Sequence, residues 1–122
     1  MRIPFFKRKA KKQRYTIAFY NLENLFDPER NKNTLDRDYT PTGLKKWTVE
    51  RYRRKLSKLA KTITRIGEEK HPYPPVLIGV AEAENNSVLE ALLDTDPMED
   101  LDYDFIHFDS PDERGIDTGL IY

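Results

Sequence analysis

Cysteine is absent from this chain of 122 residues, and glycine accounts for only five of them. The lack of cysteine excludes a disulfide framework and any metal site built on thiolates. The sequence also has no Gly-rich phosphate loop, no paired-histidine zinc motif and no nucleophile elbow of the Gly-x-Ser-x-Gly kind. No apolar run approaches the length needed to cross a bilayer. The sequence therefore excludes the enzyme classes built on these three motifs, and it excludes a membrane-spanning segment.

The composition is that of a globular chain. Hydrophobic residues make up 38% of it, and the aromatic residues are seven tyrosines, six phenylalanines and one tryptophan. This content is too apolar for a chain that is disordered throughout. A length of 122 residues allows one hydrophobic core. We therefore expect at most one domain.

Charge is segregated along the chain although the formal net charge is zero. Residues 1–14 hold seven Lys/Arg and no acid, and residues 44–70 hold ten Lys/Arg against three acids. Residues 82–117 reverse the balance, with thirteen Asp/Glu opposed only by Arg114. This pattern suits a site that holds cations and meets polyanions, and it also suits ordinary solvated faces.

Residues 1–14 begin with the positive charge of a signal peptide but lack its apolar segment and its cleavage site. We expect a disordered basic arm and a cytoplasmic protein. The alternative for the arm is contact with nucleic acid or with an acidic membrane surface.

Apolar runs bounded by turn residues predict four strands, at residues 15–21, 76–82, 103–108 and 116–122. A short helix capped by Ser87 is predicted over residues 88–93. Residues 28–46 are polar and rich in turn formers, so we expect a long loop that borders the functional site.

The longest predicted helix follows Thr48, a residue type favoured as an N-cap. Apolar residues then recur at steps of three and four, at Val49, Tyr52, Leu56, Leu59, Ile63 and Ile66. One face should pack on a sheet, while the many Lys and Arg residues share the remainder with solvent.

The first two predicted strands each end on a polar residue, Asn21 and Glu82, and the helix lies between them. Strand, helix, strand is the βαβ unit, whose strands lie parallel and adjacent. Both polar ends should therefore meet at the carboxyl edge of one sheet, where open α/β sheets bind ligands. The sequence thus brings a carboxamide and a carboxylate together.

Oxygen ligands of this kind suit Mg²⁺ or Mn²⁺, which proteins often hold with one or two carboxylates. Glu82 fits the role of principal ligand, and Glu23 and Asn21 could supply further oxygens. The alternative is that these residues only form turns at the strand ends.

Arg114 is the one cation in its acidic neighbourhood. Its guanidinium could clamp a phosphate, or it could pair structurally with Asp117. His71 precedes a proline cluster and reads as a loop residue, and His107 reads as a packed strand residue rather than a catalytic one.

Three segments in order resemble the endonuclease/exonuclease/phosphatase superfamily, the deoxyribonuclease-I-like and exonuclease-III-like group. They read FYNLENLFD, IGVAEAEN and RGIDTGLIY, at residues 19–27, 78–85 and 114–122. The resemblance implies an α/β fold of four layers, with two packed β-sheets between helices, and metal-dependent cleavage of phosphate esters. This chain would supply roughly the first half, one sheet with flanking helices.

The resemblance also implies roles for individual residues. Asn21 would lie at the catalytic site, Glu82 would be the principal ligand of Mg²⁺ or Mn²⁺, and Glu23 would lie near the metal. Arg114 and Asp117 would line the same pocket and contact the substrate phosphate.

The later motifs of the superfamily, a catalytic histidine, an Asp-x-Asn pair and a Ser-Asp-His sequence, do not occur in these residues. We therefore expect residues 15–122 to be the N-terminal part of such a domain, inactive or nearly so alone, and able to self-associate through its open sheet. The complete protein would be an endonuclease hydrolysing phosphodiester bonds. Alternatives are a phosphomonoesterase of the same superfamily and a non-catalytic half-domain that binds nucleic acid or a partner subunit.

Overall fold

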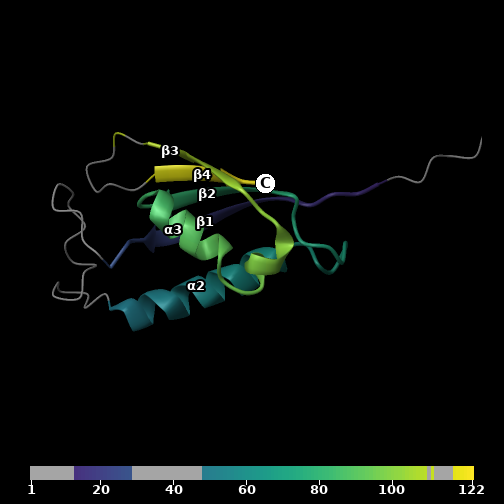
Figure 1. Cartoon of the computed structure of the whole chain (residues 1–122). Coiled ribbons are helices and arrows are strands. Elements are labelled where there is room, and N and C mark those ends of the chain that lie inside the picture. Colours follow the sequence, from purple (N-terminus) through teal and green to yellow (C-terminus); the bar gives the residue numbers. More distant parts are fainter. Residues whose placement is uncertain (1–12, 29–47, 110, 112–116) are drawn as a thin grey trace, which may run out of the picture.

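A computed structural model describes residues 13–28, 48–109, 111 and 117–122, and these form an α/β fold with one sheet (Figure 1). Apart from residues 13 and 14, the expected basic arm lies outside the described residues. The expected loop of residues 28–46 lies outside them too, apart from Pro28, as does Arg114.

Among the described residues the sheet has four strands, in the order β1-β2-β4-β3. Their bounds are Ile17–Leu25 for β1, Leu77–Ala83 for β2, Phe105–Phe108 for β3 and Asp117–Ile121 for β4. The pair β1 and β2 is parallel, as the βαβ argument predicted, whereas β4 runs antiparallel to both of its neighbours. The carboxyl ends of β1 and β2 and the first residue of β4 consequently share one edge of the sheet.

The helix α2 (Val49–Thr64) starts where the sequence predicted, because the hydroxyl of Thr48 accepts a hydrogen bond of 3.1 Å from the backbone N–H of Arg51. Its buried side chains lie one helical turn apart along one stripe, at Leu56, Leu59, Ala60, Ile63 and Thr64. The prediction was wrong for Val49, which is 51% exposed because the first turn extends past the core.

The helix α3 (Asn86–Leu93) begins earlier than predicted. Its N-cap is Asn85, whose Oδ1 accepts a 3.0 Å hydrogen bond from the backbone N–H of Val88, so the assignment of Ser87 as the cap was wrong. Asn is at least as good a cap as Ser, which explains why it takes the position. A 3-10 helix, η2 (Met98–Leu101), follows and buries Met98.

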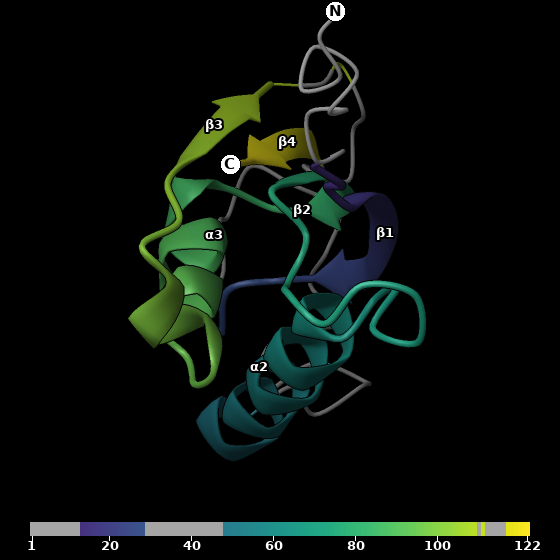
Figure 2. The same cartoon turned by 90° about the vertical axis from the view of Figure 1, so that its right-hand side faces the viewer.

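Helices α2 and α3 lie on one side of the sheet, as the two perpendicular views show (Figures 1 and 2). Core residues from the sheet and both helices meet in this layer. No helix among the described residues is long and apolar enough to span a bilayer. On the other side, which we call the open sheet face, large apolar side chains are exposed at Ile17, Phe19, Ile106, Phe108 and Tyr122.

Candidate active site

The strand β1 continues beyond Asn21, where the sequence predicted its end. Asn21 pairs with Ala81 of β2, and the next pairing joins Leu25 to Ala83. Three residues of β1 therefore stand opposite a single residue of β2, Glu82. This bulge re-aims the side chains at the strand ends, as bulges beside functional sites commonly do.

The backbone of the bulge is left-handed at three non-glycine residues, Glu23 (φ 54°), Asn24 (φ 57°) and Glu82 (φ 65°). Asparagine tolerates this region, but for glutamate it costs about 1–2 kcal/mol per residue. Leu22 and Leu25, on either side of the left-handed pair, are both fully buried. The core therefore holds the strained segment in place, a pattern that recurs at functional sites.

The side chains of Asn21 and Glu82 are in direct contact. Asn21 Nδ2 donates a 2.8 Å hydrogen bond to Glu82 Oε2, and Asn21 Oδ1 accepts one of 2.6 Å from the backbone N–H of Glu23. The amide orientation is determined by its partners, because a backbone N–H can only donate and a carboxylate can only accept. The βαβ argument predicted this convergence from residues 61 positions apart.

The second oxygen of Glu82 is also engaged, since Oε1 accepts a 3.0 Å hydrogen bond from the backbone N–H of Asn24. The bulge thus supplies a donor to one carboxylate oxygen while Asn21 supplies a donor to the other. Hydrogen bonds to an ionised acceptor are roughly twice as strong as neutral ones. Glu82 is therefore a partly buried carboxylate in a fixed orientation.

Lys55 connects α2 to the bulge, because its Nζ donates to the backbone carbonyl of Glu23. Burial lowers the pKa of this ammonium, and the carboxylates of Glu23 and Glu82 oppose that shift. A cation from the helix consequently lies beside the Asn21–Glu82 pair. Nothing in the sequence indicated this contact.

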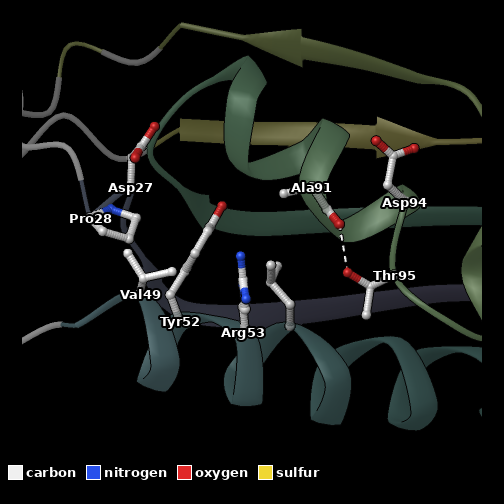
Figure 3. A pocket seen from close by; sticks show the side chains of 9 residues that line it. Asp27, Pro28, Val49, Tyr52, Arg53, Ala91, Asp94 and Thr95 are labelled. Carbon is white, nitrogen blue, oxygen red and sulfur yellow. Dashed lines mark hydrogen bonds between the residues drawn. The ribbon is translucent and has the colours of Figure 1, made fainter.

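The carboxylate of Glu84, just beyond the end of β2, serves a different purpose. Glu84 is buried, and its Oε1 accepts a 2.6 Å hydrogen bond from the backbone N–H of Asp27, which fixes the chain as it leaves β1. Burial raises the pKa of the Tyr52 hydroxyl above its ordinary value, and Asp27 and Glu84 raise it further. Asp27 and Tyr52 line a pocket of about 660 Å³ between α2 and α3 (Figure 3).

Asp117 pairs in register with Ala83, so it lies at the same sheet edge as Glu82. Its buried carboxylate, however, lies 2.7 Å from Nε2 of His107. The Asp117–His107 pair lies on the helix-covered side of the sheet. Gly119 is two residues from Asp117 along β4 and pairs with His107, so the three residues share one face, and Gly119 faces Leu89 of α3. Asn21 instead lies on the open sheet face, because it follows the exposed residues Ile17 and Phe19 at every second position along β1.

The structure therefore brings together three of the five residues selected from the sequence, namely Asn21, Glu23 and Glu82. Asp117 shares their edge but contacts His107, and Arg114 lies outside the described residues. The assignment of these two residues to a substrate phosphate stays a prediction.

A sequence model described as the endonuclease/exonuclease/phosphatase family matches residues 16–122, which is nearly the whole chain. The chain belongs to this family. No match was found among curated proteins or among solved structures. The resemblance stated above is thereby confirmed. Family membership supports phosphoesterase chemistry that generally depends on divalent metal ions. The matched range includes every site residue described here.

Proposed function

We propose that this member of the endonuclease/exonuclease/phosphatase family contributes the metal-binding half of an endonuclease that hydrolyses phosphodiester bonds. The observation that supports the proposal most directly is the Asn21–Glu82 contact at the carboxyl edge of a parallel strand pair. Open α/β sheets bind ligands at this edge.

The side chains at this edge suit Mg²⁺ or Mn²⁺. Both ions prefer oxygen ligands, and Glu23 lies opposite Glu82 in the bulge, with both carboxylates close enough to Lys55 to act on the pKa of its ammonium. Asn24, in the same bulge, has a buried Oδ1 with no hydrogen-bond partner among the described residues. Glu82 would be the principal ligand, with Glu23 and Asn21 beside it. When bound, the cation would offset the negative charge that develops on a phosphate ester.

The protein's own groups keep Glu82 in place. The amide of Asn21 and the backbone N–H of Asn24 each hold one carboxylate oxygen. Lys55 fixes the bulge that presents these donors through its bond to the carbonyl of Glu23. A preorganised carboxylate needs little rearrangement when charge develops, which is the usual origin of electrostatic catalysis.

The proposal is tested by replacing Glu82 with Gln, which preserves size and removes the charge. Mn²⁺ binding measured by titration calorimetry should weaken at least tenfold in Glu82→Gln. The control, Glu90→Gln, changes an exposed glutamate of α3 and should leave binding unchanged. Equal Mn²⁺ affinity in wild type and Glu82→Gln would refute the proposal.

The substrate is tested on supercoiled DNA, RNA and a phosphomonoester with Mg²⁺ or Mn²⁺ present. Nicking of DNA that is lost in Glu82→Gln supports the endonuclease. Turnover of the phosphomonoester alone would instead favour a phosphatase of the same family. We expect slow turnover in either case, because the later motifs of the superfamily do not occur in these residues.

Self-association through the open sheet face is a further part of the proposal. Ile17 and Phe19 are each 71% exposed there, which is unusual for large apolar side chains clustered on one surface. Sedimentation should show concentration-dependent dimers that Phe19→Ser weakens. A wild-type chain that stays monomeric at high concentration would refute this part alone.

A further inference from the structure

A groove of about 560 Å³ lies between α2 and the bulge, and four of the five described residues that line it are cations. We call it the cationic groove, and its lining is Glu23, Arg51, Arg54, Lys55 and Lys58. Lys55 is partly buried, while the other three cations are exposed. Glu23 belongs to the candidate metal site, so the groove and that site share a boundary.

The groove is the start of a longer row of positive charge. Six cations lie on the same side of the helix, each three or four residues from another, at Arg51, Arg54, Lys55, Lys58, Lys61 and Arg65. At 1.5 Å per residue the row spans about 21 Å. The only acid within α2 is Glu50, in its first turn. At the far end the charge of Arg65 is offset by Glu68, which lies 3.2 Å away.

We propose that the cationic groove binds backbone phosphates of a nucleic-acid strand on one side of the bond that is cleaved at Asn21–Glu82. This inference rests on the function proposed above and adds where the substrate lies. The bond between Lys55 and the carbonyl of Glu23 makes the two surfaces continuous. A strand that leaves the metal site along α2 meets Arg54 and Lys58 next.

The length of the row matches a polymeric substrate. Phosphates in one strand of a duplex are separated by about 3.4 Å along the axis, so the part of the row from Arg51 to Lys61, about 15 Å long, faces about four of them. A phosphomonoester would occupy only the metal site and would leave these cations without a role. The fork of an arginine and the ammonium of a lysine are both common phosphate ligands.

A membrane surface fits the groove less well than nucleic acid does. Helices that lie on membranes insert an apolar face beside their cationic one. In α2 the apolar face packs into the core through residues such as Leu56 and Ile63, and Val49 is its only large hydrophobic residue that is markedly exposed. The surface of α2 that remains for a partner is therefore almost entirely charged and polar.

The test uses the full chain with Arg54→Gln/Lys58→Gln as the groove variant. Its control is Arg53→Gln/Lys70→Gln, which removes the same charge from exposed residues outside the groove. Binding of a fluorescent single-stranded oligonucleotide is measured by anisotropy between 50 and 300 mM salt, with EDTA present. Vesicles of phosphatidylserine are tested in parallel.

Each phosphate contact contributes about 0.7 to the slope of log affinity against log salt for a single strand. Loss of two contacts should reduce the steepness of the slope by about 1.4. Because the contribution of these contacts to the affinity vanishes near 1 M salt, this change corresponds to about 25-fold weaker binding at 0.1 M salt. The control should match wild type. Equal losses in both variants, no loss in either, or a loss confined to vesicles would overturn the inference.

The two experiments distinguish failure of the proposed metal site from failure of the cationic groove. Glu82→Gln should bind the oligonucleotide in EDTA as well as wild type does, and the groove variant should bind Mn²⁺ as well as wild type does. A normal Mn²⁺ affinity in Glu82→Gln refutes the metal site whatever the anisotropy shows. A groove variant that binds the oligonucleotide normally refutes the groove whatever the calorimetry shows.

Discussion

Replacing Asn21 with Asp should destabilise the metal-free protein and strengthen its response to divalent cations. The substitution turns the 2.8 Å contact between Nδ2 and Glu82 Oε2 into a contact between two carboxylate oxygens. The bond from the N–H of Glu23 to Oδ1 can remain, because the new residue keeps that oxygen. The variant therefore tests one interaction with little change in shape.

The magnitude follows from the distance and the exposure of the pair. Two unit charges about 4 Å apart repel by about 1 kcal/mol in water and about 4 kcal/mol at the effective dielectric near a protein surface. The exposed position of Asn21 favours the lower half of this range, and loss of its hydrogen bond adds about 1 kcal/mol. We expect a loss of about 2–3 kcal/mol at pH 7 in EDTA.

The pH dependence has a definite sign. Repulsion by the Glu82 carboxylate raises the folded-state pKa of the new aspartate above its ordinary value near 4, so the folded state binds protons more readily than the unfolded one. The deficit should be complete above the raised pKa and should disappear as the pH falls below about 4. At pH 7, Mn²⁺ at about 100 times its Kd should restore about 2.7 kcal/mol.

The assay is urea unfolding at pH 4 and pH 7, with EDTA and with Mn²⁺, and the matched control is Asn86→Asp. Asn86 is exposed at the start of α3, where a negative charge is neutral or slightly favourable. If Asn21→Asp is as stable as Asn86→Asp in EDTA at both pH values, Asn21 and Glu82 are not in contact in solution. The account of the site would then be wrong.

Two further predictions concern stability. Gly67→Ala should cost about 1–2 kcal/mol in urea unfolding, because φ is +79° and the added Cβ would lie 3.1 Å from Thr16 Cγ2; an unchanged midpoint would contradict this backbone conformation. Burial raises the pKa of the Tyr52 hydroxyl in the folded state. The contribution of the neutral Tyr52 side chain to stability is therefore complete below pH 10 and is lost as the pH rises through the folded-state pKa. Tyr52→Phe should lessen the loss of stability above pH 10, and equal alkaline unfolding of both proteins would show that Tyr52 ionises as freely as in the unfolded chain.

The convergence of the site could be predicted from the sequence because topology alone determines it. Two apolar strands separated by a helix must lie parallel, so their polar ends share an edge. This argument needs no side-chain detail, and it placed Asn21 beside Glu82 correctly. The N-cap at Thr48 was predictable for a similar reason, since the signal is local.

The bulge could not be predicted, because its cause is not local. Left-handed residues are normally anticipated from glycine, and the residues that adopt this conformation here are Glu23, Asn24 and Glu82. The contact of Lys55 with the bulge was equally hidden, since the helical pattern places a lysine on a face but does not say what lies opposite. The pairing of Asp117 with His107 depends on the register of β3 and β4, which the imperfect alternation of residues 103–108 did not reveal.

The burial of two leucines explains why the strained bulge persists. Leu22 and Leu25 are three residues apart, and both are fully buried, which a regular strand would not allow because its side chains alternate between faces. Full burial of each contributes about 1.5–3 kcal/mol, and the two left-handed glutamates cost about 1–2 kcal/mol each, so burial offsets the strain. Forming the bulge therefore costs little net free energy. The same distortion directs the N–H groups of Glu23 and Asn24 toward Asn21 and Glu82, so the packing of the core orients the candidate metal ligand.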